Sequence, residues 1–95
     1  MPRNKKPRYT RFTPGVNYFK PQGVPLRLLE EVILMPDELE ALKLYEVDNF
    51  DQITAAGKMR VSQPTFARIL SSANKKIALA ITNGWAIRIE NRTNI

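Results

Sequence analysis

Apolar positions recur at helical spacing in two adjacent stretches of the chain, within residues 51–82. The first stretch places apolar side chains three residues apart, which predicts one stripe of a short helix. The second repeats the helical spacing over a longer run, which predicts a helix from Ser62 to about Thr82. The predicted core positions are Ile53, Ala56 and Met59 in the first helix and Phe66, Ile69, Leu70 and Ala73 in the second. The pattern therefore predicts two helices joined by a tight turn.

The residues between these helices have the chemistry of such a turn. Arg60, Val61 and Ser62 follow the first helix, and Val61 is expected to plug the space between the two helices. The Ser62 hydroxyl can cap the second helix by accepting a hydrogen bond from a free backbone N–H. Pro64 falls in the first turn, where a missing N–H does no harm. Arg60 stands where glycine is usual in these turns, which costs about 1 kcal/mol if φ is positive.

This combination predicts a helix-turn-helix, in which the first turns of the second helix enter the major groove of DNA. The spacing alone leaves an ordinary helical hairpin as the alternative.

Elements flanking the pair are also predicted. Pro36 suits the first position of a helix that ends near Val47, and Asp37 and Glu38 suit the positive end of its macrodipole. Its buried stripe is expected at Leu39, Leu42 and Leu44 or Tyr45. Asn83-Gly84 should end the second helix of the pair, since glycine accepts the left-handed conformation.

One further segment, Trp85–Ile89, alternates apolar residues with small or charged ones, which is the period of a strand. A single strand is not stable alone. The candidate partners within the chain are Val16–Phe19 and Val32–Leu34. A second copy of the chain is the other candidate, so a homodimer is also expected.

Charge is segregated along the 95 residues, whose net charge is +6. Residues 1–25 hold six cations and no acid, residues 26–51 hold two cations and eight acids, and residues 52–89 hold six cations and no acid. A basic arm and a basic helix-turn-helix separated by an acidic segment favour a polyanionic partner, most simply nucleic acid. The acidic segment should face away from the phosphates.

Several classes of function are excluded by composition. The chain has no cysteine and no histidine, so it lacks the commonest general base and the commonest metal ligands. We expect no enzyme activity, no metal and no cofactor. No apolar run is long enough to span a membrane, and no secretory signal is recognisable, so a cytoplasmic protein is expected.

The candidate contacts with double-stranded DNA fall into two groups. Gln63, Thr65 and Arg68, at the start of the second helix, are the predicted base-reading residues. Basic residues around them and in the arm are predicted to contact the phosphate backbone. This second group consists of Arg3, Lys5, Lys6, Arg8, Lys58, Arg60, Lys75 and Lys76. The alternative for each cation is ordinary surface charge.

Four separated motifs carry a family resemblance. They are YFKPQGVPL (18–26), DELEALKL (37–44), VSQPTFARIL (61–70) and GWAIRIE (84–90). In order and spacing the chain resembles uncharacterised protein family 0251, also called domain of unknown function 134. The resemblance implies a small prokaryotic DNA-binding protein whose helix-turn-helix is similar to region four of RNA polymerase sigma factors.

The sequence thus predicts a mainly α fold, with a three-helix helix-turn-helix core, a basic N-terminal arm and one or two short flanking β-strands. Residues 1–13 are expected to form a flexible arm, and residues 14–95 a single domain with the helix-turn-helix at 51–82. The expected function is sequence-specific DNA binding, in a transcriptional regulator. The alternatives are an interaction protein that docks on RNA polymerase or another basal transcription factor, and RNA binding by the arm.

Overall fold

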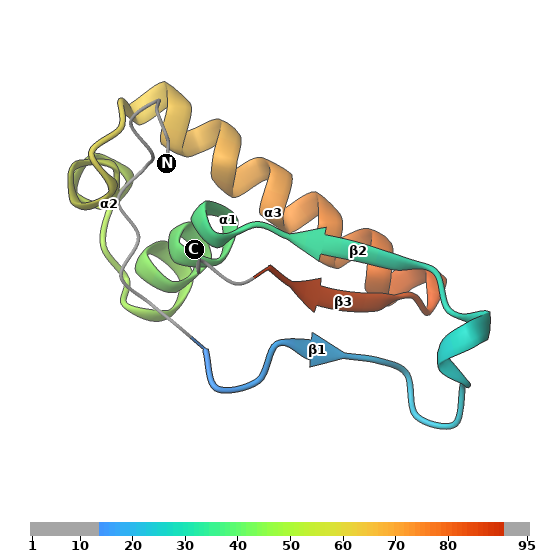
Figure 1. The fold of residues 1–95 in the computed structure, drawn as a ribbon. Helices are drawn as coiled ribbons and strands as arrows, with labels where there is room; N and C mark the ends of the chain where they lie inside the picture. The colour runs from blue at the N-terminus through green and yellow to red at the C-terminus, as the bar shows by residue number, and fades with distance from the viewer. Residues whose placement is uncertain (1–13, 91–95) are drawn as a thin grey trace, which may run out of the picture.

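The computed structural model describes residues 14–90, and the predicted arm, residues 1–13, lies outside them. The helical elements are η1 (Leu26–Leu28), α1 (Pro36–Leu42), η2 (Lys43–Val47), α2 (Gln52–Met59) and α3 (Gln63–Asn83). The strands are β1 (Tyr18–Phe19), β2 (Glu31–Leu34) and β3 (Ala86–Ile89). In Figure 1, α2 lies beside the start of the long α3, while the strands lie along its C-terminal half. This mainly helical fold with a small sheet confirms the predicted fold class.

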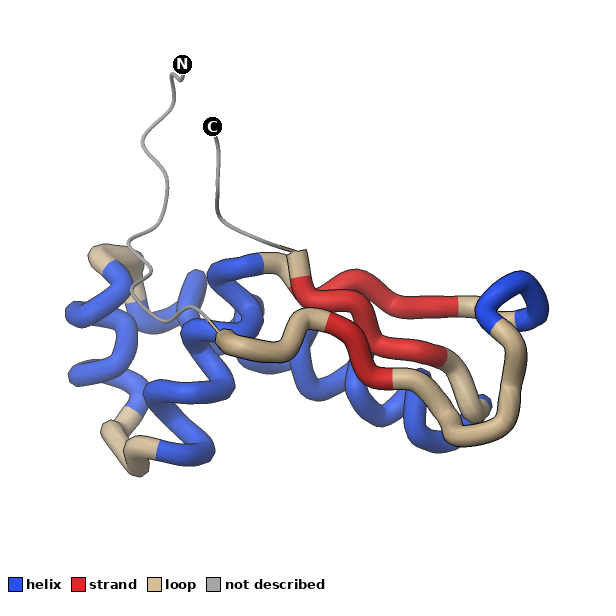
Figure 2. The backbone as a smooth tube through the Cα atoms, turned by 60° about the horizontal axis from the view of Figure 1, so that its bottom comes forward, coloured by secondary structure: helices blue, strands red, loops and turns tan. Residues whose placement is uncertain are grey.

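The sheet resolves the question of which segment pairs with the predicted strand at Trp85–Ile89. The strand order is β1-β3-β2, so β3 is central and both predicted partners flank it. β3 pairs antiparallel with β1 and parallel with β2. The parallel pairing is possible because three helices separate β2 from β3 in the chain. β3 therefore offers no unpaired edge to a second copy, and Figure 2 shows the three strands side by side at one end of the molecule.

The main core lies where α1, η2, α2 and α3 meet. Phe66 of α3 and Met59 of α2 are its largest fully buried side chains. The remaining buried members are Ala41, Leu44, Ala55, Ala56, Ile69 and Leu70. A second, smaller cluster of Leu34, Ala73 and Ile89 joins α3 to the sheet. The apolar face predicted for α3 is thus confirmed.

The stripe predicted for α2 is wrong at one position. Ile53 is 70% exposed, and Ala55 is buried in its place. Steps of three residues fall short of a full turn by about 60° each, so Ile53 has rotated away from the line through Ala56 and Met59. Ala55, Ala56 and Met59 have the spacing that keeps one face toward α3.

Helix α1 begins at Pro36 as predicted and continues through η2, a π-helical segment, to the predicted end at Val47. Of the predicted stripe, Leu44 is buried, whereas Leu39, Leu42 and Tyr45 are half-buried. The sequence did not predict that Glu38 and Glu40 would be buried as well. Among the described residues, no helix is both long and apolar enough to cross a membrane.

Replacing Phe66 by alanine should destabilise the protein by about 3–5 kcal/mol, because Phe66 of α3 is fully buried in the main core. Ile81→Ala on the same helix is the control, since Ile81 is 72% exposed and its truncation should leave stability nearly unchanged. Chemical denaturation measures both. Equal stability of Phe66→Ala and wild type would contradict the packing of the helix pair.

Candidate nucleic-acid interface

The turn between α2 and α3 is built from backbone hydrogen bonds around Arg60. Arg60 has φ 60° and ψ 42°, the left-handed conformation that normally favours glycine. Its N–H donates to the Gly57 carbonyl at 3.1 Å, and the Val61 N–H donates to the Ala56 carbonyl at 3.1 Å. This pair of bonds is the Schellman arrangement that ends a helix. Val61 is half-buried against the main core, which confirms its predicted place between the helices.

The first turn of α3 is fixed by the predicted cap. The Ser62 Oγ accepts a hydrogen bond from the Thr65 backbone N–H at 3.2 Å, and Pro64 occupies the first turn. At the other end Gly84, with φ 70°, stops the helix as predicted. Because its start is capped and its apolar face is buried, α3 holds the opposite face of its first turns toward solvent.

The three predicted base-reading residues all lie in the first two turns of α3, but they differ in exposure and in hydrogen bonding. Gln63 and Arg68 are exposed, and Thr65 is half-buried. The Thr65 Oγ1 accepts hydrogen bonds from the Ser62 Oγ at 3.0 Å and from the Arg68 Nη2 at 3.3 Å. The hydroxyl of Thr65 therefore links the cap to the Arg68 guanidinium. This hydrogen bond restricts the orientation of the Arg68 side chain, which remains exposed.

The predicted phosphate contacts near the helix pair also differ in setting. Arg60 and Lys75 are exposed. The Lys58 ammonium lies 4.7 Å from the centre of the Phe50 ring, a cation–π distance that leaves it at the surface of α2. Lys76, which is half-buried, makes contacts within the protein instead. Its Nζ donates to the Glu38 Oε1 at 2.7 Å and to the Ile33 carbonyl at 2.6 Å. The predicted contacts in the arm, Arg3, Lys5, Lys6 and Arg8, lie outside the described residues.

Two polar residues at this surface were not among the predicted contacts. Ser71 is exposed one turn after Arg68, and the helical period alone could have found it. Gln52, the first residue of α2, accepts a hydrogen bond from the Gln63 Nε2 at 3.5 Å. No local pattern indicates that contact, because it depends on how the two helices cross.

The partner of Lys76 is a buried carboxylate that joins several elements. Besides Lys76, Glu38 accepts hydrogen bonds from the Met35 backbone N–H at 2.8 Å and from the Ser72 Oγ at 2.5 Å. Burial acts to raise the pKa of Glu38, but these hydrogen bonds and the charge of Lys76 outweigh it, so the pKa is lowered. Glu38 therefore stays ionised and holds α1 against α3.

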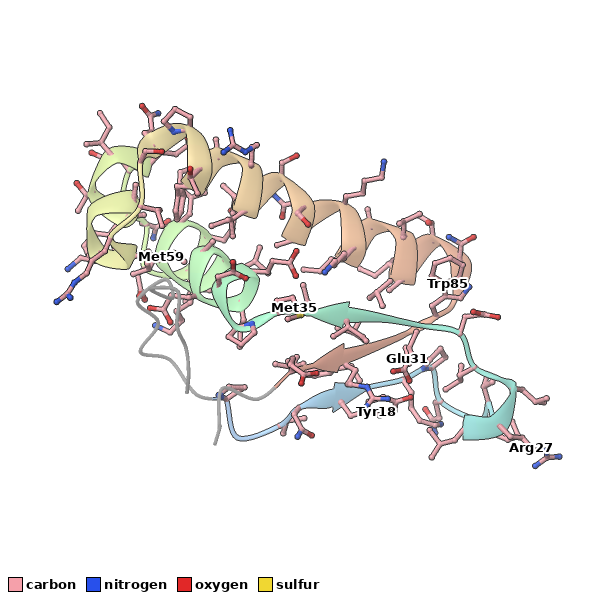
Figure 3. The ribbon with its side chains drawn as sticks, turned by 45° about the horizontal axis from the view of Figure 1, so that its top comes forward. Tyr18, Arg27, Glu31, Met35, Met59 and Trp85 are labelled. Carbon is pink, nitrogen blue, oxygen red and sulfur yellow. The ribbon has the colours of Figure 1, made fainter. Side chains whose placement is uncertain are left out.

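A second polar cluster lies at the far end of the molecule, on the sheet. The Tyr18 hydroxyl donates to the Glu31 Oε2 at 3.2 Å, and the Arg88 Nε donates to the Glu31 Oε1 at 2.7 Å. Figure 3 shows Tyr18 and Glu31 at the sheet and Met59, the last residue of α2, toward the opposite end of the molecule. The cluster links the side chains of all three strands. Its charges are already paired, and it lies away from the start of α3.

Comparison with known proteins identifies the family. The family model described as "Protein of unknown function DUF134" matches residues 1–93, and the chain belongs to this family. A UPF0251 protein of Caldanaerobacter subterraneus is 53% identical over 90 residues, which cover 95% of this chain and 76% of the relative. A UPF0251 protein of Moorella thermoacetica is also 53% identical, with 95% and 60% covered. One from Rhodospirillum rubrum is 44% identical, with 95% and 63% covered. No solved structure matches the chain.

The acid stability of the protein should depend on Glu38. Since the folded pKa of Glu38 is lowered from 4.5, its contribution is fully present above about pH 4.5 and is lost as the pH falls through the lower folded value. Glu38→Gln should therefore cost about 1–3 kcal/mol at pH 7 and flatten the loss of stability in acid. Denaturant unfolding at a series of pH values measures both effects.

The control for Glu38 is Asp48→Asn, which breaks the exposed pair between Lys43 and Asp48 (2.8 Å). This change should alter stability by less than about 1 kcal/mol. If Glu38→Gln and wild type lose stability in parallel below pH 4.5, the carboxylate does not hold α1 against α3 as described.

The left-handed backbone at Arg60 should be measurable as strain. Arg60→Gly should be more stable than Arg60→Ala by about 1 kcal/mol, because only glycine adopts φ 60° without a steric penalty. Both variants remove the same side-chain charge, so their difference in unfolding free energy reports the backbone alone. An alanine variant as stable as the glycine variant would show that the turn is not left-handed in solution.

Proposed function

We propose that this protein binds double-stranded DNA in a sequence-dependent manner and acts as a transcriptional regulator in the cytoplasm. The first turns of α3 would enter the major groove, with Gln63 and Arg68 directed at base edges. The observation that carries the proposal is the capped, exposed start of α3, whose first two turns present a glutamine amide and an arginine guanidinium to solvent. Glutamine can form bidentate hydrogen bonds with adenine, and arginine can form them with guanine.

The distribution of charge around α3 supports the same surface. Residues 52–89, which form α2, α3 and β3, contain six cations and no acid. Glu38, from the acidic segment, is buried and paired with Lys76. The exposed cations Lys58, Arg60 and Lys75 would contact phosphates on either side of the reading residues and so fix how α3 lies in the groove.

Within this proposal Thr65 and Lys76 have roles other than the base contact and the phosphate contact predicted from the sequence. Thr65 steers Arg68, because its hydroxyl oxygen already accepts two hydrogen bonds. Lys76 anchors α3 to Glu38 and Ile33, and contributes no phosphate contact. Binding as a homodimer to two half-sites stays part of the proposal, although the contact would have to form away from the central strand β3.

The proposal is tested by selecting bound duplexes from a random DNA pool and measuring affinity for the selected and a scrambled sequence. Arg68→Ala should lose about 1–3 kcal/mol of discrimination between them, since Arg68 is directed at a base. Lys75→Ala, a cation farther along the same exposed face, should weaken both duplexes equally. Failure to enrich any sequence would refute the proposal, and docking on RNA polymerase would become the leading candidate.

The basic arm should add phosphate contacts. Deleting residues 1–11 removes five cations, Arg3, Lys5, Lys6, Arg8 and Arg11. The truncated protein should melt at the same temperature as the full chain but bind DNA more weakly. The slope of log K against log salt should shallow by about 0.9 for each phosphate that the arm no longer neutralises. An unchanged slope, measured by fluorescence anisotropy, would mean that the arm does not touch DNA.

A further inference from the structure

The two helices of the DNA-binding pair are joined by a contact between glutamine side chains. Gln52 opens α2 and Gln63 opens α3, and the Gln63 Nε2 donates to the Gln52 Oε1 at 3.5 Å. The two helices are also packed through the buried Met59 and Phe66, which fixes the positions of both backbones. The contact is therefore made between the first residues of two helices that do not move independently.

The contact has a consequence for how Gln63 can read DNA. A glutamine reads adenine with its amide oxygen as acceptor and its amide nitrogen as donor, both in one plane. Gln63 is exposed, so without a partner its amide would rotate and present either atom to a given base. When one N–H of Gln63 is directed at Gln52, the second N–H and the Oε1 face outward in a defined order.

Gln52 is unsuited to act on DNA by itself. Asp51 directly precedes it and caps α2, with its Oδ1 accepting from the Thr54 N–H at 2.7 Å. That hydrogen bond lowers the pKa of Asp51, so the cap keeps its negative charge. A DNA phosphate at this helix end would be repelled by the Asp51 carboxylate. Gln52 is also half-buried, whereas Gln63 is exposed.

We infer that Gln52 is a positioning residue for DNA recognition: it orients the Gln63 amide, and the pair together sets the base preference at one position of the site. This inference rests on the proposed function. It adds that specificity comes from both helices of the pair, and that Gln52 acts only through Gln63.

The test compares the base preferences of four proteins, selected from one random duplex pool: wild type, Gln52→Ala, Gln63→Ala and the double variant. Gln63→Ala identifies the base pair that Gln63 reads. Gln52→Ala should reduce the preference at that base pair by about 3- to 10-fold, the effect expected of one freed side chain. It should leave the other positions unchanged and add nothing in the Gln63→Ala background.

Two further variants separate positioning from general effects. Ile53→Ala changes the next residue of α2, which is 70% exposed, and should leave every base preference unchanged. Gln52→Glu keeps an acceptor for the Gln63 amide, so it should retain the preference while the added charge weakens binding overall. Melting temperatures confirm that each variant folds.

The results of this selection distinguish a failure of the role of Gln52 from a failure of the proposed DNA binding. A wild-type protein that enriches no sequence overturns both. If the wild type enriches a motif, additive effects of Gln52→Ala and Gln63→Ala overturn the pairing alone. An equal loss at every position after Gln52→Ala also overturns it, since that is the behaviour of a phosphate contact.

Discussion

The buried carboxylate of Glu38 is the interaction on which the arrangement of this small protein depends. A buried charge is costly unless it is paired and hydrogen-bonded. Glu38 is satisfied only when α3 packs against the start of α1, because its hydrogen bonds come from Met35, Ser72 and Lys76. Lys76 completes the junction by donating both to Glu38 and to the Ile33 carbonyl. The second half of α3 is thereby anchored to the sheet and to α1, while its first turns remain outside the junction and keep a solvent-facing side.

Local chemistry predicted much of the helix pair. The cap at Ser62, the proline in the first turn and the glycine stop at Gly84 act through neighbouring backbone atoms, so the sequence contains what is needed to recognise them. Ile53 was wrongly predicted to be buried because steps of three residues drift away from a helical stripe, and apolar character alone does not show which residues another helix will cover. The pairing of the strands also depends on tertiary contacts. Both candidate partners of β3 could be recognised in the sequence, but the sequence could not show that the two flank β3 in one sheet.

Some features of the candidate interface could likewise be predicted from local sequence, and others could not. The exposed positions of Gln63 and Arg68 follow from the helix start and its periodicity. The pairing of Lys76 with Glu38 could not be predicted in this way, because the two residues are 38 positions apart in the chain. The contact between Gln52 and Gln63 was likewise invisible, since it requires the crossing of α2 and α3. The charge pattern showed that acids and bases are segregated, but not that the carboxylate of Glu38 turns inward to meet a lysine of the basic segment.

We propose that the start of α3 is the surface that reads DNA. Backbone amide shifts in NMR spectra, followed while duplex DNA is added at moderate salt, test it most directly because they locate the contact without a substitution. We expect the largest changes on residues 60–72, with smaller changes at the start of α2 and little change in the sheet. Changes centred on β1, β2 and β3, or a spectrum unaltered by DNA, would contradict it.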